Sequence, residues 1–546
     1  MRSFKRVLGL VFAIAMMMTG LSFSVSADRT VVETAVFADQ YSYTLYSDGL
    51  LEVISKSDTI DLEKISQTSL EKAKSLSVDL SGSNEVYLSV SCYKSYCNIN
   101  SFKFICSDNQ TVYGITIKGF SKFTGAAGSV ILSGKSDIGS LTLKESNVTS
   151  SDFLTGLKIE AFVFSNCNLL ETVTVSGDFD ACDITDCDKL TKVDLRGCTK
   201  MTECKINKNK ELAELYYPDS LFLIRSYGCI KNPKLTDLKI PGSAYEIQDG
   251  AFQESGLKSV TISDGVTRIG YYSFAGTSLE TVNISATVNR IDAKAFSGCS
   301  SLKTVNFGGT QALFEKIYVS NSNESVYKIF GDAKINFDET KKSVWAQGGD
   351  KWFYFDNAGL MVTDWKYING AWYLFSHYGI MLKDWQKSGN TWYYLGSDGA
   401  MRTGWQSIGG AWYYFGSDGI MRQDWQSING KWYYLGSDGS MRTGWQNIGG
   451  KWYYFESSGA MVTGWKQSGG NWYFFKSDGS MAAGEYCNGY WLNSSGTWTY
   501  QYKATWTKDS NGWWFGDQTG WYAKNQSLKI DGKTYSFNAR GYCTNP

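Results

Sequence analysis

Apolar and polar positions in the C-terminal third of the chain recur every 20 residues. Each unit has two tryptophans seven residues apart, more aromatic residues, a small polar turn and a methionine. The unit from Gly404 to Arg422 reads G-W-Q-S-I-G-G-A-W-Y-Y-F-G-S-D-G-I-M-R. An aromatic run before a glycine turn predicts a β-hairpin: strand Trp412–Phe415, turn Gly416–Gly419, a return strand from Ile420 and a loop over Trp425–Gly430.

Seven such units follow one another, so the hairpins are expected to stack. An isolated hairpin is barely stable in water, whereas hairpins in series bury aromatic surface on their neighbours. Strand alternation places Trp412 and Tyr414 on one face and Tyr413 on the other. We therefore expect the middle tyrosine of each unit to form the stacking core, namely Tyr393, Tyr413, Tyr433 and Tyr453.

A second periodicity of 22 or 23 residues precedes the tryptophan units. Leu235, Leu257, Leu279 and Leu302 keep this step, and strands such as Leu257–Ile262 alternate between apolar and polar positions. A repeat of this size predicts a solenoid whose coils bury a face on their neighbours. The fold class is therefore all-β with a repeat architecture. The expected parts are a signal peptide at 1–27, an N-terminal β-rich cap at 28–130 with a hairpin around 41–54, a solenoid at 131–310, a connector at 311–342, seven 20-residue repeats at 343–484 and degenerate C-terminal repeats at 485–546.

Composition supports a secreted β protein. Aromatic residues make up 15% of the chain, and the 56 glycines against 4 prolines suit short strands joined by tight turns. The 53 basic and 53 acidic residues balance, which argues against electrostatic binding of nucleic acid or an anionic membrane. A basic start, a short apolar run and Val25-Ser26-Ala27 predict a cleaved secretory signal, and no later segment predicts a membrane span.

The cysteines and the single histidine carry little predicted chemistry. Cys167, Cys187, Cys198 and Cys299 each precede a solenoid strand and are expected to form a column of buried thiols. Disulfides are the alternative, with Cys92 to Cys97 or Cys106, and Cys182 to Cys187, as the nearer pairs. No C-x-x-C pair suggests zinc. His377 lies in a repeat turn, so residues 28–344 lack the histidine of the common hydrolytic triads, and we expect no enzyme and no cofactor.

The excess of tryptophan over leucine or valine predicts a ligand site at the aromatic faces. Tryptophan is hard to bury completely because its N–H needs a partner. Several aromatic faces with a methionine beside them can enclose a quaternary ammonium by cation–π attraction, worth about 0.5–2 kcal/mol.

The motif G-W-x-x-x-x-G-x-W-Y-Y-x-x-x-x-G-x-M resembles the choline-binding, or cell-wall-binding, repeat of Gram-positive surface proteins. The resemblance implies a β-hairpin solenoid that holds phosphocholine of teichoic or lipoteichoic acid between successive hairpins. The third aromatic is missing at Leu374 and altered at Phe474, so the boxes of those two units are weaker predictions. The residues it implies as choline boxes are Trp365, Trp372, Trp385, Trp392, Tyr394, Met401, Trp405, Trp412, Tyr414, Met421, Trp425, Trp432, Tyr434, Met441, Trp445, Trp452, Tyr454, Met461, Trp465 and Trp472.

The 22-residue pattern resembles the bacterial-surface (BspA-type) leucine-rich repeat, best over 235–307. In that family the repeats serve recognition and adhesion, which implies an adhesin or protein-binding scaffold with an unidentified protein or host-surface partner. The chain end carries no L-P-x-T-G-like signal, so non-covalent attachment to the wall is expected. Binding of a glucan or host glycan is the alternative for the tryptophan repeats, because sugar rings also stack on aromatic residues. A cell-wall hydrolase is the third.

Overall fold

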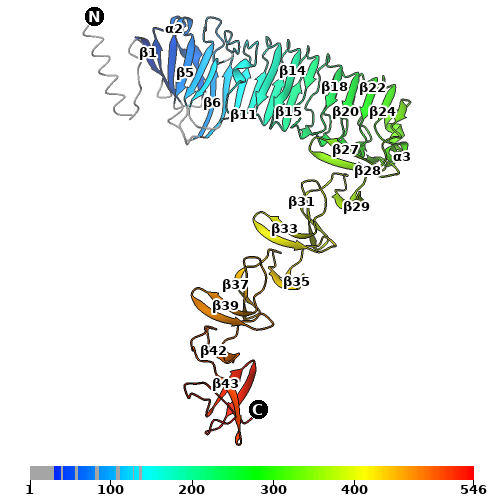
Figure 1. The fold of residues 1–546 in the computed structure, drawn as a ribbon. Helices are drawn as coiled ribbons and strands as arrows, with labels where there is room; N and C mark the ends of the chain where they lie inside the picture. The colour runs from blue at the N-terminus through cyan, green and yellow to red at the C-terminus, as the bar shows by residue number, and fades with distance from the viewer. Residues whose placement is uncertain are drawn as a thin grey trace, which may run out of the picture. The chain divides into compact units, whose positions relative to one another are not determined.

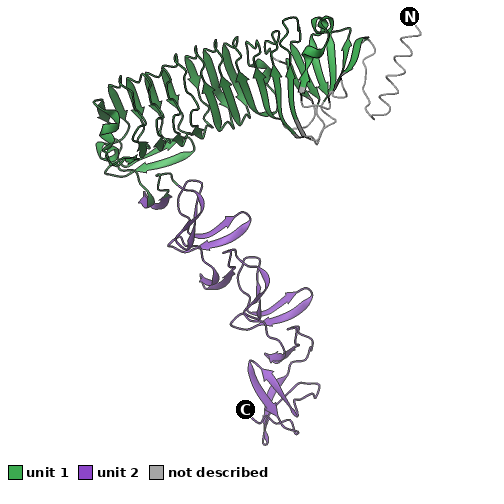
Figure 2. Ribbon diagram, turned by 180° about the vertical axis from the view of Figure 1, so that it is seen from behind, with its two compact units in different colours: residues 1–364, 375–381 green, residues 365–374, 382–546 purple. Residues whose placement is uncertain are grey.

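The computed structural model describes residues 30–37, 41–55, 59–79, 85–105, 111–126, 128–133 and 138–546. The predicted signal peptide at 1–27 and Cys106 lie outside these ranges. The chain divides into two compact units (Figure 2), residues 1–364 with 375–381 and residues 365–374 with 382–546. No helix in the described ranges has the length and apolar character needed to cross a bilayer.

The first unit begins with an antiparallel meander of β1 (Val31–Phe37), β2 (Tyr41–Tyr46) and β3 (Leu50–Ser55). The hairpin predicted around 41–54 is confirmed, because Tyr41 pairs with Ser55 and Leu45 with Leu51. Strand β3 then pairs in parallel with β5 (Ser75–Asp79). Parallel stacking therefore starts well before residue 131, and the expected cap is largely the beginning of the solenoid.

Parallel strands of five sheets run along the solenoid, whose coils lie side by side in Figure 1. A seven-stranded sheet contains β4 (Thr59–Asp61), β6 (Glu85–Ser91), β8 (Thr111–Lys118), β10 (Ile138–Lys144), β11 (Ile159–Ser165), β13 (Ala181–Thr185) and β15 (Glu203–Asn207), and a five-stranded sheet contains β17 (Leu223–Ile224), β19 (Glu246–Ile247), β21 (Arg268–Ile269), β23 (Arg290–Asp292) and β25 (Tyr318–Ser320). Strands β5, β7 (Ser101–Ile105) and β9 (Val130–Ser133) share a sheet with β1 to β3, a three-stranded sheet contains β12 (Thr172–Gly177), β14 (Lys192–Cys198) and β16 (Glu214–Tyr216), and a second five-stranded sheet contains β18 (Asp237–Ile240), β20 (Ser259–Ile262), β22 (Thr281–Ile284), β24 (Thr304–Phe307) and β26 (Lys334–Phe337). Short helices at η1 (Leu62–Lys64), α2 (Gln67–Lys72), η2 (Asp152–Leu154), α3 (Gln311–Phe314) and η3 (Val326–Phe330) interrupt the coils.

The 22-residue period places equivalent apolar residues in columns between the sheets. Ile247, Ile269 and Ile291 stack in register and are fully buried. Phe252, Phe274 and Phe296 form a second column, with ring centroids 5.2 Å apart at each step. Because each coil buries one face on the next, the core is continuous along the unit, as expected for a repeat solenoid.

Buried thiols occupy one turn of the early coils at Cys167 and Cys187, as predicted for these two cysteines. Of the other two expected members of the column, Cys299 is only partly buried, and Cys198 is buried at the end of β14 against the Val175 carbonyl. The Cys167 and Cys187 thiols are fully buried and face main-chain carbonyls, with Cys167 Sγ 3.5 Å from the Leu143 oxygen. The column continues with Asn209 and Asn232, whose amides donate to carbonyls of the preceding coil. All cysteines of the described ranges are free thiols, so the alternative disulfides Cys92–Cys97 and Cys182–Cys187 are absent.

Residues 311–342 form a further coil instead of the expected connector. Strand β25 pairs with β23, and β26 pairs with β24, so both five-stranded sheets extend through this segment. Its polar sequence hides a buried set that includes Phe314, Val319 and Phe330. These side chains complete the core of the last coil.

The tryptophan units form two-stranded antiparallel hairpins, each composed of five-residue strands. Each hairpin pairs the two tryptophan segments, so the segment expected as a loop is a strand. In one unit Gly404–Ile408 pairs with Ala411–Phe415 around Gly409 and Gly410, which have φ of +60° and +84°. Positive φ at both turn positions is typical of a type I′ hairpin turn. The strands are β27 (Val344–Gly348), β28 (Lys351–Phe355), β29 (Asp364–Ile368), β30 (Ala371–Phe375), β31 (Asp384–Ser388), β32 (Thr391–Leu395), β33 (Gly404–Ile408), β34 (Ala411–Phe415), β35 (Asp424–Ile428), β36 (Lys431–Leu435), β37 (Gly444–Ile448), β38 (Lys451–Phe455), β39 (Gly464–Ser468) and β40 (Asn471–Phe475).

Residues 485–546 keep hairpins but change their pairing. The hairpins are β41 (Glu485–Cys487) with β42 (Tyr490–Leu492), β43 (Thr505–Asp509) with β44 (Gly512–Gly516), and β45 (Gln526–Ile530) with β46 (Lys533–Phe537). Strands β41 and β45 pair in parallel, which joins the first and third hairpins into one four-stranded sheet. Glu485, at the position where a tryptophan was due, is 1% exposed and pairs with Lys476 and Lys529.

Candidate functional site: aromatic cages between hairpins

Each hairpin of the repeat array has two chemically different faces. Trp405 lies directly across from Tyr414, and Ser407 lies across from Trp412, so both tryptophans and Tyr414 share a face. Tyr413 and Phe415 occupy the opposite face by strand alternation. The predicted placement of Trp412 and Tyr414 opposite Tyr413 agrees with this register.

The stacking core is formed by the last residue of each second strand. This position is 0–2% exposed in every unit of the array, and the residues are Phe355, Phe375, Leu395, Phe415, Leu435, Phe455 and Phe475. The middle tyrosines were expected to fill this role, but only Tyr453 is buried, whereas Tyr393, Tyr413 and Tyr433 are partly buried. The core residue lies two positions after the middle tyrosine and, by strand alternation, on the same face of the hairpin.

The middle tyrosine instead closes a cage with the two tryptophans of the preceding hairpin. The Trp425 ring lies 6.4 Å from Trp432 and 4.8 Å from Tyr453, with interplanar angles of 79° and 65°. Trp425 therefore contacts both the second tryptophan of its own hairpin and the middle tyrosine of the next one. The same arrangement recurs at Trp385, Trp392 and Tyr413 (6.3 and 4.9 Å) and at Trp445, Trp452 and Tyr473 (6.2 and 4.7 Å).

Two further junctions carry the same first tryptophan and middle tyrosine. Trp405 lies 4.9 Å from Tyr433, and Trp365 lies 4.8 Å from Tyr393. The unit with Leu374 therefore keeps its tyrosine wall, since the wall comes from the neighbouring hairpin. Trp465 has a different environment, with Tyr490 at 5.6 Å and Trp498 at 6.0 Å.

The third-position tyrosines that were expected in the boxes lie within the same hairpin as their tryptophans. Tyr394, Tyr414, Tyr434 and Tyr454 are 5.1–5.4 Å from the first tryptophan of their own unit. Each first tryptophan is thus held between its own third-position tyrosine and the middle tyrosine of the next unit. The sequence does carry a signal for the missed wall, because the middle tyrosine is present even where Leu374 and Phe474 replace the third-position residue.

In six of the seven units the second tryptophan is the exposed ring, whereas Trp352 of the first unit is only partly exposed. The six are 39–48% exposed, and they are Trp372, Trp392, Trp412, Trp432, Trp452 and Trp472. A tryptophan that served only packing would bury more of its large apolar surface. The array therefore presents a row of half-exposed indoles at a constant step.

The methionines line the junctions through both backbone and side chain. Met421 N donates to the Trp392 carbonyl at 2.8 Å, which joins it to the tryptophan of the preceding unit. Its sulfur lies against Gly439 of the next unit, where an added Cβ would clash. Met401, Met441 and Met461 make the same two contacts in their units. The expected methionines are therefore beside the cages, with their sulfur atoms packed on turn glycines.

A similar cage lies in the C-terminal residues, where no box was expected. Trp506 lies 6.5 Å from Trp513 at 87° and 4.8 Å from Tyr535 at 69°. Trp513 is 39% exposed, and Cys543 N donates to its carbonyl at 2.7 Å, at the place of the methionine. The seven-residue spacing of the two tryptophans was the available sequence signal.

Two of these tryptophans already have a cation near the ring. Lys387 Nζ lies 5.9 Å from the Trp392 centroid, and Lys508 Nζ lies 5.5 Å from the Trp513 centroid. The acidic residues near the cages are mostly engaged elsewhere, since Asp398, Asp418 and Asp438 pair with the arginines four residues later. Within the described ranges no group of histidine, cysteine and carboxylate side chains is placed to hold a metal ion.

Comparison with known families identifies both repeat types. The BspA type leucine-rich repeat region matches residues 136–228 and 223–330 in six copies. The choline-binding repeat matches 362–403, 402–441, 422–463 and 442–486, and a putative cell wall binding repeat matches 345–361. These family descriptions name no catalytic domain. A search of curated proteins finds none that matches.

Solved structures with similar segments include choline-binding proteins of Streptococcus pneumoniae. Choline binding protein F is 39% identical over 29% of this chain and 57% of its own, with a TM-score of 0.28. CbpJ is 35% identical over 35% of this chain and 62% of its own, with a TM-score of 0.24. The choline-binding domain of CbpL is 31% identical over 37% of this chain and 98% of its own, with a TM-score of 0.24. The chain thus spans less than two thirds of the first two proteins.

Proposed function

We propose that this chain, which joins BspA-type leucine-rich repeats to choline-binding repeats, is a surface protein held on a bacterial cell wall without a covalent bond. The C-terminal repeats bind choline groups of teichoic or lipoteichoic acid. Two of the solved proteins that resemble this segment, choline binding protein F and CbpL, are choline-binding proteins, which supports the ligand class. The observation that carries the proposal is the row of half-exposed second tryptophans, which lie in the same hairpins as first tryptophans that contact a tyrosine of the next hairpin.

The geometry of the rings favours a quaternary ammonium over a sugar. Tryptophan pairs such as Trp425 and Trp432 meet at 79–86°, so their faces and edges surround a space instead of forming one flat platform. A roughly spherical trimethylammonium group can contact several such rings at once. A sugar ring is better matched to a single flat face, which makes the glucan or host-glycan alternative less well supported.

The number of cages supplies the affinity that one cage lacks. A cation–π cage contributes about 0.5–2 kcal/mol per ring contact, which gives weak binding at one site. Several cages that face a polymer with many choline groups gain by effective concentration, often about 10²–10⁴ in avidity. We infer that the cage of Trp506, Trp513 and Tyr535 adds a site to the array.

The experiment that tests this proposal compares two resins. The full chain is expected to be retained on a choline-substituted resin in high salt, to elute with free choline, and to pass through dextran. Retention on dextran with passage through the choline resin would favour the glycan alternative.

For the leucine-rich repeats we infer a recognition role, as an adhesin or protein-binding scaffold presented from the wall. Exposed aromatic residues on the solenoid support a binding surface, since Tyr87 and Tyr113 stack at 5.0 Å and are 65% and 41% exposed. Large exposed aromatics are enriched at protein interfaces. Capture of surface proteins from host and bacterial cells on immobilised full chain, with release by soluble residues 28–340, tests this role.

A further inference from the structure

A cavity of about 480 Å³ lies in the first unit, beside the last coils of the leucine-rich repeat solenoid. Strands β23 and β25 supply one wall through Arg290 and Tyr318. Leu360 with Met361, and His377 with Tyr378, supply the other. The volume falls within the range of small-molecule sites, which is roughly 300–1,000 Å³. None of the tryptophans assigned to the cages lines it.

The charged side chains of this cavity are all cationic or basic. Arg290, Lys316 and His377 line it, and its lining contains no aspartate or glutamate. Lys316 is exposed and so can move toward a ligand. Basic groups without acidic neighbours in a concave site attract an anion.

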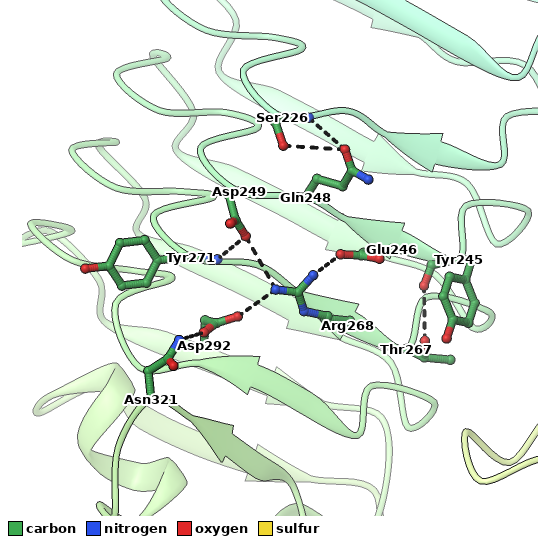
Figure 3. Close-up of polar contacts among 10 residues, drawn as sticks. All are labelled: Ser226, Tyr245, Glu246, Gln248, Asp249, Thr267, Arg268, Tyr271, Asp292 and Asn321. Carbon is green, nitrogen blue, oxygen red and sulfur yellow. Dashed lines mark hydrogen bonds and ion pairs between the residues drawn. The ribbon is translucent and has the colours of Figure 1, made fainter.

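Arg290 differs from the arginine that stacks next to it in register. Arg268 pairs with Arg290 across adjacent strands and is held by Glu246, Asp249 and Asp292, as Figure 3 shows. Asp292 directs one oxygen to Arg268 at 3.0 Å and the other to Asn321 at 2.7 Å. The neighbouring carboxylates are therefore already occupied.

The Arg290 guanidinium has donors to spare. It lies 5.7 Å from the Tyr318 ring, and the described part of the chain gives it no carboxylate within ion-pair distance. Its Nε is buried and has no hydrogen-bond acceptor among the described residues. A guanidinium presents five N–H donors in a fork that matches a carboxylate or a phosphate. An oxyanion in the cavity would satisfy them.

The remaining walls of the cavity are apolar and are held in place. Ile317 is 6% exposed, and Leu360 and Met361 pack against the core of the unit. Tyr378 contacts Tyr245 edge to face at 5.4 Å, and the Tyr378 carbonyl accepts from Asn289 Nδ2 at 3.4 Å. The site therefore combines a basic end with a preformed apolar and aromatic side.

We propose that this cavity binds a small organic oxyanion, a phosphate or carboxylate group carried on an apolar or aromatic body. Arg290 binds the oxyanion, Lys316 adds a second positive charge, and Tyr318 and Tyr378 contact the body. This site is separate from the cages and stands whether or not the cages bind choline.

His377 provides a direct reporter because it is the single histidine of the chain. The full-length protein, labelled with ¹³C at histidine, gives one Cε1–H signal to follow by NMR at constant ionic strength. The probes are phenyl phosphate, benzoate and the neutral benzyl alcohol. The expected result is a saturable shift with at least one of the two anions and none with benzyl alcohol.

Two substitutions place the anion on the named side chains. Arg290→Gln removes the fork, and Lys316→Gln removes an exposed charge that leaves the core untouched. Each is expected to weaken anion binding, by about tenfold or more for Arg290→Gln, because a hydrogen bond to a charged group is lost. Arg196→Gln is the matched control, since Arg196 also stacks on a tyrosine ring but pairs with Asp194 elsewhere.

The outcomes separate cleanly. A linear, non-saturating shift or equal binding of benzyl alcohol overturns the proposal. The proposal is also overturned if Arg290→Gln folds and both it and Lys316→Gln keep the wild-type affinity for the anion. If Arg290→Gln does not fold, loss of affinity in Lys316→Gln with full affinity in Arg196→Gln supports the site, and full affinity in both contradicts it.

Discussion

Substitution of Trp432 tests whether the half-exposed tryptophans are ligand walls. Trp432 is 48% exposed, and its ring stands 6.4 Å from Trp425 at the junction that Tyr453 closes. Trp432→Leu removes the aromatic face but keeps an apolar side chain over the buried half of the position. Trp432→Tyr is the matched control, because it keeps an aromatic face of smaller size.

The expected changes follow from the burial and the ring geometry. About half of the indole is covered, so exchange for leucine costs at most about 2 kcal/mol of folding free energy. Loss of one cation–π face costs about 0.5–2 kcal/mol of binding, which is roughly a 2- to 30-fold weaker site. Affinity at this cage is therefore expected to fall in the order tryptophan, tyrosine, leucine, while the other cages keep theirs.

Calorimetric titration of the full chain with choline chloride measures the result. Trp432→Leu is expected to have one fewer high-affinity choline site than the wild type. It is also expected to elute from a choline-substituted resin at a lower concentration of free choline. Unchanged binding in Trp432→Leu would show that this ring does not contact the ligand. Loss of every site would show that the cages do not act independently, which contradicts the avidity argument.

Three other predictions concern the framework that holds the sites. Leu435 has 0% exposure, so Leu435→Ala is expected to lower the unfolding free energy by about 2–5 kcal/mol, measured by urea denaturation, without removing an aromatic ring. A loss under about 1 kcal/mol would contradict the place of Leu435 in the stacking core. Arg268→Met leaves the carboxylate of Asp292, which is 1% exposed, without its cation, so the free energy of unfolding is expected to fall by about 3–5 kcal/mol. If the unpaired carboxylate is the cause, the double variant Arg268→Met with Asp292→Asn recovers part of this loss. Hydrogen bonds from the Ser480 side chain, at 2.6 Å, and from the Ser480 backbone hold the pKa of Asp478 below its ordinary value. Because the pKa of Asp478 is lower in the folded protein, the carboxylate stabilises the fold at pH values above its unfolded pKa, and this contribution is lost as the pH falls below about 4. The thermal denaturation temperature of Asp478→Asn is therefore expected to depend less on pH between about 3 and 6 than that of the wild type.

The two repeat periods predicted most of the fold from the sequence. A 22-residue step in the leucine positions has few structural solutions, and the parallel solenoid has this step, with Ile269 and Phe274 stacked on their equivalents in the next coils. The same reasoning missed the coil at 311–342, because its apolar residues lack the regular step although Phe314 and Phe330 are buried. Periodicity identifies repeated coils more readily than the irregular ones at their ends.

Turn chemistry limited what the sequence could say about the cages. Gly409-Gly410 and Ser417-Asp418-Gly419 are both good turn signals, and only the pairing of Trp405 with Tyr414 shows which one closes the hairpin. The choice of turn decides which tyrosine faces which tryptophan. A wall donated by the next hairpin, as Tyr453 is to Trp425, depends on the stacking of two units, so the recurring middle tyrosine alone does not show which tryptophan it contacts.

The most direct test of choline binding by the repeats is elution from a choline-substituted resin. The full chain is loaded in high salt, washed with more salt, and then challenged with free choline. The cages predict that salt leaves the protein bound and that choline releases it, because the rings hold the ammonium group by short-range contact. Passage through the column, or release by salt alone, would contradict choline binding by these repeats.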